Sequence, residues 1–123
     1  MRMQYPLSGE RRRHRRWEVG GRHVGRLDSA HQASILDLSL GGALIEHASS
    51  HVWPETVAFL TLAAPGQEAG LKCRVAHSTV HRYEVQPTGD RDLIYRSGLE
   101  FLDTSEASLQ LIDKFIDSVK KAN

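Results

Sequence analysis

The sequence has little cysteine and no long apolar run. Its 123 residues include one cysteine, which excludes an internal disulfide framework and suits a reducing compartment. No stretch approaches the roughly 18 apolar residues of a membrane-spanning helix, and the first residues lack the apolar segment of a secretory signal. We therefore expect a cytoplasmic protein with one hydrophobic core, since this length supports a single domain.

The net charge is also small, at +1, but its distribution is uneven. Residues 1–26 carry eight arginines against Glu10 and Glu18, a net of +6. Residues 27–123 carry eight basic and thirteen acidic side chains, a net of −5. The chain therefore combines a basic N-terminal arm with an acidic body.

The basic arm contains an arginine block, residues 10–16, with the sequence ERRRHRR and no lysine. A guanidinium fork can donate two hydrogen bonds to the O6 and N7 acceptors of guanine and can stack on the base, whereas an ammonium supplies charge alone. Like charges four residues apart would repel in a free helix, so we expect an anionic ligand to order the block. Residues 1–9 are expected to form a flexible leader.

Short alternating segments, separated by glycine and proline turns, indicate a mainly β domain. Five or six such segments favour a small sandwich or barrel, and we expect a barrel because closure leaves no exposed edge. We predict one domain over residues 10–123, with a switch arm at 10–16, a barrel at 17–102 and an α-helix at 104–121. The predicted strands include residues 35–40, 43–45, 57–62, 71–80 and 93–102, and residues 83–86 can extend the fourth.

The C-terminal helix is predicted from a different apolar period. Its apolar residues recur at helical spacing, so the helix should pack one face on the barrel, which we favour, or on a partner protein. Asp103 or Thr104 can cap its first turn. The apolar positions are Leu109, Leu111, Ile112, Phe115, Ile116 and Val119.

A polar motif lies on the strand predicted at residues 35–40. Alternation places Ile35, Asp37 and Ser39 on one face, with Asp37 and Ser39 roughly 7 Å apart. A carboxylate can accept hydrogen bonds from guanine N1 and N2, and a hydroxyl can donate one to a phosphate. The following pair, Gly41 and Gly42, permits a bend and lets a backbone amide come close to a ligand. With the arginine block, this set is complementary to a guanine nucleotide.

The two motifs resemble those of the PilZ domain family, bacterial receptors for cyclic di-GMP. The family combines Arg-x-x-x-Arg in an N-terminal loop with (Asp/Asn)-x-Ser-x-x-Gly on a barrel. Here Arg12 to Arg16 and residues 37–42 satisfy both patterns. Arg11 to Arg15 fits the first spacing too, but the position of Trp17 at the start of the apolar strand favours Arg12 and Arg16.

The resemblance implies a six-stranded antiparallel barrel with a C-terminal helix and no catalytic activity or cofactor. It implies cyclic di-GMP as ligand and a downstream protein partner, whose surface contacts would change when the arm closes. By analogy, Arg12 and Arg16 would bind guanine edges and phosphate, Asp37 a guanine, and Ser39 a phosphate or a base edge. Gly42 would make room for the ligand, and Arg11 and Arg13 would add stacking or charge.

Two other functions are compatible with the sequence. The arm could bind RNA or DNA without selecting guanine dinucleotides, although nucleic acid is not the favoured partner. Alternatively, the domain could be a PilZ-fold adapter that binds protein and no nucleotide.

Several residues with reactive side chains are expected to have structural roles. The pairs His47/His51 and His77/His81 have the spacing of metal ligands on a helix, but in strands this spacing separates them by about 13 Å. Ser39 has no histidine placed beside it by a motif, so it is not expected to be a nucleophile. Cys73 alternates with apolar neighbours and is expected to be buried.

Overall fold

The fold is described here from a computed structural model, which describes residues 17–28, 31–48, 52–102 and 105–122. The predicted leader and switch arm, residues 1–16, lie outside these ranges, as do His51, Asp103 and Thr104.

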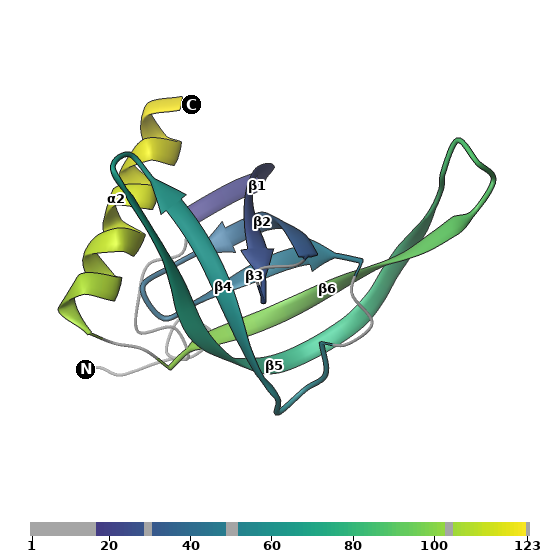
Figure 1. The fold of residues 1–123 in the computed structure, drawn as a ribbon, viewed down its shortest axis with the longest axis horizontal. Coiled ribbons are helices and arrows are strands. Elements are labelled where there is room, and N and C mark those ends of the chain that lie inside the picture. Colours follow the sequence, from purple (N-terminus) through teal and green to yellow (C-terminus); the bar gives the residue numbers. More distant parts are fainter. Residues whose placement is uncertain (1–16, 29–30, 49–51, 103–104, 123) are drawn as a thin grey trace, which may run out of the picture.

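Six antiparallel strands close into a barrel in the order β1-β2-β3-β6-β5-β4 (Figure 1). The prediction of a mainly β domain with a six-stranded barrel and a C-terminal helix is therefore confirmed. The strands are β1 (Trp17–Leu27), β2 (His31–Leu38), β3 (Gly42–His47), β4 (Val57–Ala64), β5 (Gln67–Val85) and β6 (Arg91–Phe101).

The barrel interior is filled by aliphatic side chains from alternate strand positions. Within the barrel the strands send mostly every second residue inward, so the buried set includes residues of all six strands and forms one cluster. The thiol of Cys73 belongs to this cluster, as predicted, and burial raises the pKa of the thiol to about 12. In the strands, the largest fully buried aliphatic side chains are Leu27, Ile35, Leu38, Ile45, Leu60, Leu62, Leu71 and Val75.

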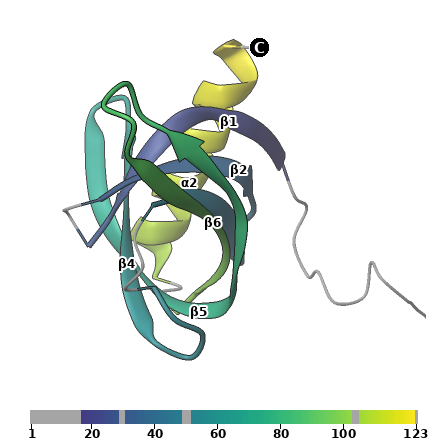
Figure 2. The same cartoon turned by 90° about the vertical axis from the view of Figure 1, so that its right-hand side faces the viewer.

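The helix α2 (Glu106–Ala122) packs on one side of the barrel, against β4, β5 and β1 (Figures 1 and 2). Its N-cap is Ser105, whose Oγ accepts a hydrogen bond from the Ser108 backbone N–H at 3.3 Å. The sequence instead suggested Asp103 or Thr104, because either residue type can cap. No helix in the described ranges is both long and apolar enough to cross a membrane.

The alternation predicted for residues 35–40 is wrong at one position. Ile35 and Leu38 are both fully buried, whereas Asp37 between them is half-buried. The pairing with β3 advances from Ile35 opposite Ile45 to Asp37 opposite Leu44, so Leu36 is an extra residue in a β-bulge. The bulge reverses the phase of the strand. Ile35 therefore faces the core instead of sharing a face with Asp37.

The strands β5 and β6 extend past the barrel as a two-stranded ribbon (Figure 1, right). The pairing of β4 with β5 ends at Val57 opposite Arg74, and the pairing of β3 with β6 ends at His47 opposite Tyr95. From there β5 and β6 pair only with each other, up to Val85 opposite Arg91. The sequence predicted both strands but not this extension as one continuous hairpin.

Replacing Leu60 by alanine should destabilise the barrel strongly, because the Leu60 side chain is fully buried in the cluster. We expect a loss of about 2–5 kcal/mol in the free energy of unfolding, measured by urea denaturation. Val57→Ala, on the exposed face of the same strand, is the matched control and should cost less than about 1 kcal/mol. Equal losses for the two variants would contradict this assignment of the inner face of β4.

Candidate functional site around the β2–β3 turn

The predicted polar motif forms the tight turn between β2 and β3. The backbone N–H of Ser39 donates to the Gly42 carbonyl at 2.9 Å and closes the turn. The Ser39 hydroxyl accepts a hydrogen bond from the Gly41 N–H at 3.1 Å. Ser39 therefore fixes the local backbone in addition to presenting a half-buried hydroxyl.

Gly42 lies where β3 comes closest to β6. A Cβ atom added at Gly42 would be 2.2 Å from the carbonyl oxygen of Leu99, a distance that no real side chain tolerates. The Phe101 N–H also donates to the Gly41 carbonyl at 2.9 Å, which holds β6 against the turn. The absence of a side chain at residue 42 thus makes room for β6, a requirement that the motif alone did not reveal.

Asp37 lies on the outer face of the barrel, beside the turn. It is opposite Glu18 on β1 and opposite Leu44 on β3, and it is half-buried. Because Leu38 points into the core, the neighbouring Asp37 points outward. The structure therefore brings Asp37, Ser39 and Gly42 together on one turn.

The arginine block is attached to the chain beside this turn. Arg11, Arg12, Arg13 and Arg16 lie outside the described residues, but Arg16 is bonded to Trp17, which pairs with Leu38. The Trp17 ring packs partly on the core, and the Lys120 ammonium of α2 lies 4.4 Å from its centroid. The arm thus joins the barrel at Trp17, on β1, which is the strand next to β2 and its turn.

The outer face next to Gly42 carries an ion cluster that the sequence did not reveal. Glu100 is opposite Gly42 on β6, and Arg74 is opposite Glu100 on β5. Arg74 Nε donates to Glu100 Oε1 at 2.7 Å, and Arg74 also contacts Glu55. The hydrogen bond to Glu100, together with the charge of Glu55, raises the pKa of Arg74. No local motif links these residues, because they come from three separate parts of the chain.

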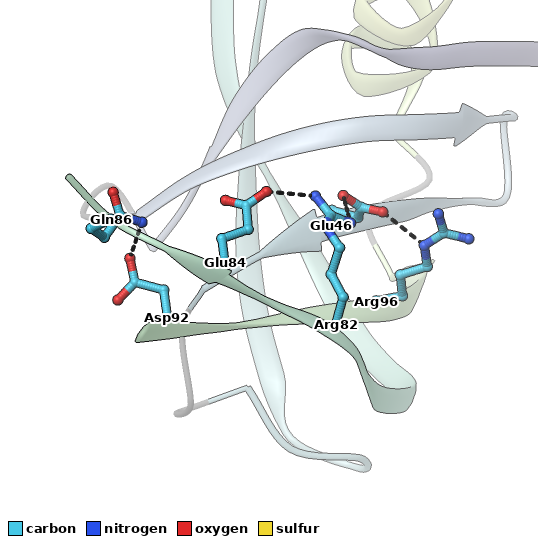
Figure 3. A network of polar contacts seen from close by, with 6 residues as sticks. All are labelled: Glu46, Arg82, Glu84, Gln86, Asp92 and Arg96. Atoms are coloured by element: carbon cyan, nitrogen blue, oxygen red, sulfur yellow. Dashed lines mark hydrogen bonds and ion pairs between the residues drawn. The ribbon is translucent and has the colours of Figure 1, made fainter. Parts of the chain in front are cut away.

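A second network lies further along the same face, around Glu46 on β3 (Figure 3). Arg96 Nε donates to one carboxylate oxygen at 2.8 Å, and Arg82 donates to the other at 3.0 Å. Burial alone would raise the pKa of Glu46, whose side chain is 13% exposed, but the two arginine hydrogen bonds outweigh burial and lower it. This carboxylate is therefore held ionised between two cations.

The histidines do not form a metal cluster in the described part of the chain. His47 is buried, and its Nε2 lies 2.7 Å from the Ser97 hydroxyl. His77 and His81 both lie in β5, and the His77 ring covers Gly98, where an added Cβ would be 2.2 Å from its Nε2. Among these residues, no three potential ligands come close enough to bind one ion.

These features define a small antiparallel barrel that presents a polar turn beside the root of a basic arm. A family model described as the PilZ domain matches residues 10–118, which include both motifs. The chain belongs to the PilZ domain family, as the motifs predicted. No curated protein matches it.

Three solved structures have the same fold. The structure described as the PilZ domain of YcgR from Escherichia coli with c-di-GMP is 15% identical, with a TM-score of 0.65, over 91% of this chain and 93% of that one. The K. pneumonia MrkH-c-di-GMP complex is 21% identical, with a TM-score of 0.61, over 91% of this chain and 54% of that one. A further MrkH structure, described as a c-di-GMP-dependent transcription regulatory factor, is 16% identical, with a TM-score of 0.62. This chain spans about half the length of MrkH.

Gly42→Ala should destabilise the fold even without any ligand, because the new methyl group would collide with the Leu99 carbonyl. We expect a loss of about 1–3 kcal/mol in the free energy of unfolding, measured in urea. Gly70→Ala is the matched control, since its added Cβ would meet nothing closer than the Thr61 hydroxyl at 3.6 Å. If Gly42→Ala unfolds at the same urea concentration as the wild type, the close approach of β6 is not the reason for this glycine.

The Glu46 network should make stability depend on pH. The pKa of Glu46 is lowered from its usual 4.5, so its contribution is fully present above pH 4.5 and is lost as the pH falls through the folded-state pKa. Glu46→Gln should therefore lose less stability than the wild type on acidification. Urea denaturation at several pH values tests this, with Glu84→Gln, an exposed partner of Arg82, as the control. Parallel pH profiles for wild type and Glu46→Gln would contradict the prediction.

Proposed function

We propose that this protein is a receptor for cyclic di-GMP that binds the dinucleotide between the arginine block and the β2–β3 turn. The observation that carries the proposal is the register of β1 and β2. It puts Trp17 opposite Leu38, the residue after Asp37, and Arg16 immediately precedes Trp17 in the chain. The PilZ match spans both motifs, which supports the same pairing of arm and turn.

The chemistry of the two parts is complementary to this ligand. Asp37 would accept hydrogen bonds from the N1 and N2 donors of one guanine, and the Ser39 hydroxyl would donate to a phosphate or meet a base edge. Arg12 and Arg16 would supply bidentate contacts to guanine O6 and N7 and to phosphate, while Arg11 and Arg13 would add stacking or charge.

The charges of the turn explain why the arm would be needed. Glu18 is opposite Asp37, and Glu100 is opposite Gly42, so the outer face around the turn is acidic. Such a surface repels phosphates, and Arg74, which is opposite Glu100 on β5, is already engaged by Glu100 and Glu55. The arm would therefore provide the positive charge that neutralises the ligand.

The solved relatives support this ligand. The YcgR structure is described as a PilZ domain with c-di-GMP, and the MrkH structure as a MrkH-c-di-GMP complex. Both share the barrel that carries the turn in this chain.

Binding would act by shifting a population of arm conformations. Repulsion among the arginines favours an open arm, and the bound dinucleotide would bridge the arm to the turn. Trp17 would serve as the fixed point of this movement, since it pairs with Leu38 and is contacted by Lys120. The closed arm would then present a different surface to a downstream protein partner, without any catalytic step.

Removing either motif arginine should weaken cyclic di-GMP binding. We expect Arg12→Ala and Arg16→Ala each to lose about 1–3 kcal/mol, or roughly 5- to 150-fold in affinity, measured by isothermal titration calorimetry. Arg26→Ala is the control, because Arg26 pairs with Glu68 on the barrel surface and lies outside the motifs. Unchanged affinity in both motif variants would refute the site.

The same titrations separate the alternative functions. A cyclic di-GMP receptor should reject cyclic di-AMP at every salt concentration, because adenine lacks the guanine O6, N1 and N2 pattern. Nonspecific nucleic-acid binding through the arm should instead weaken steeply with salt for all sequences. Absence of any heat with excess cyclic di-GMP would favour the adapter.

A further inference from the structure

The ribbon formed by β5 and β6 beyond the barrel has two chemically different faces. Val80, Tyr83, Val85 and Leu93 are 56%, 55%, 63% and 47% exposed. The pairs Tyr83/Leu93 and Val85/Arg91 are directly opposite each other, so their side chains share one face, on which the Arg91 guanidinium lies 5.1 Å from the Tyr83 ring centroid. Apolar side chains are thus presented on a projecting element that no described part of the chain covers.

The opposite face of the ribbon is charged. Arg82 donates to Glu84 and to Glu46, both at 3.0 Å, and Asp92 accepts from the Gln86 amide at 2.7 Å (Figure 3). Arg82 is thus paired with two carboxylates of its own chain, whereas Asp92 is bonded to a neutral amide. Arg82 and Glu84, which have opposite charges, lie two residues apart on the same face of β5.

The outer edge of β5 pairs with β4 up to Arg74, and Val75 exchanges backbone hydrogen bonds with Glu55 and Thr56. Beyond Val75 no described strand lies beside this edge of the ribbon. The Gln86 N–H donates to the Asp90 carbonyl, so the backbone groups of Gln86 point toward β6. Successive residues of a strand point these groups to opposite sides. The N–H and C=O groups of Tyr83 and Val85 therefore point outward, available to another strand.

We propose that this edge pairs with the same edge of a second copy of the chain, antiparallel and centred on Tyr83. A two-fold axis at Tyr83 puts Tyr83 opposite its own copy in a hydrogen-bonded pair. It also puts Arg82 opposite the partner's Glu84, and Glu84 opposite the partner's Arg82. The segment from Arg82 to Glu84 is thus complementary to itself in charge, hydrogen bonding and apolar contact. The β-bulge at His81, between Val80 and Arg82, limits the regular pairing to this short segment.

The charge pattern favours this occupant over an unrelated strand. Charged side chains on an exposed edge usually discourage pairing, and like charges directly opposite each other are destabilising. Here the two charges next to Tyr83 have opposite signs, so the antiparallel arrangement turns both into attractive pairs. The contact is one strand wide, and the dimer should therefore be weak and concentration-dependent.

Sedimentation velocity on the full chain up to about 1 mM, with and without cyclic di-GMP, measures the dimer directly. Tyr83→Arg should weaken it at least about tenfold, because two arginines would face each other across the axis. Leu93→Arg is the matched control. Leu93 lies on the same face, opposite Tyr83, but on β6 and so away from the outer edge of β5. Its replacement should leave dimerisation nearly unchanged. Loss of the dimer in both variants would indicate that the apolar faces pack against each other and would overturn edge pairing.

A charge-exchange experiment tests the register without relying on one variant. Arg82→Glu and Glu84→Arg should each be monomeric, since each would place like charges across the axis. An equimolar mixture of the two should form a heterodimer, because the opposite charges face each other again. Recovery in the mixture also shows that both variants are folded. A wild-type chain that stays monomeric at about 1 mM, or a mixture that does not associate, would overturn the proposal.

Discussion

The antiparallel pairing of β3 with β6 is the contact on which the rest of the structure depends. It joins β1, β2 and β3 to the later strands β4, β5 and β6, and together with the pairing of β1 with β4 it closes the barrel. The pairing requires glycine at position 42, where the Leu99 carbonyl leaves no room for a side chain. The turn that carries Asp37 and Ser39 is consequently held by β6 from outside and by its own hydrogen bonds from within.

The candidate site therefore consists of two parts, a rigid turn and a chain segment that is attached to the barrel at one end. The rigid part is the β2–β3 turn, whose backbone is fixed before any ligand arrives. The attached part is the chain that precedes Trp17, which is anchored by strand pairing and by Lys120. A preformed acceptor surface reduces the entropy that binding must overcome, so most of the ordering cost would fall on the arm. That division suits a receptor whose signal is the ordering of its own arm.

The sequence was sufficient to predict the fold class because every strand keeps a period of two over most of its length. It failed at Leu36, where the alternation of Ile35, Asp37 and Ser39 appears regular in the sequence. The extra residue is determined by how β2 pairs with β3, which is a property of the assembled sheet. The same reason applies to the β5–β6 ribbon, since strand length beyond the barrel depends on where β3 and β4 stop.

The site was predictable to the extent that its residues are close in sequence. Asp37, Ser39 and Gly42 form one turn, so their spacing was informative. Glu100 and Arg74 reach the same surface from β6 and β5, and only the register shows that they lie next to Gly42. Long-range pairing therefore determines the electrostatic surroundings of a motif that is itself local.

The geometry of β6 also relates the two surfaces proposed for this protein. Glu100 lies opposite Gly42 at the turn, and Leu93 lies opposite Tyr83 in the ribbon. Seven residues of extended strand separate Glu100 from Leu93, which corresponds to about 23 Å. A bound dinucleotide at the turn would not reach the edge centred on Tyr83, so ligand and second copy can bind at the same time. Among the described residues the two surfaces share none, so within this part of the chain any influence of one on the other would have to pass through the barrel.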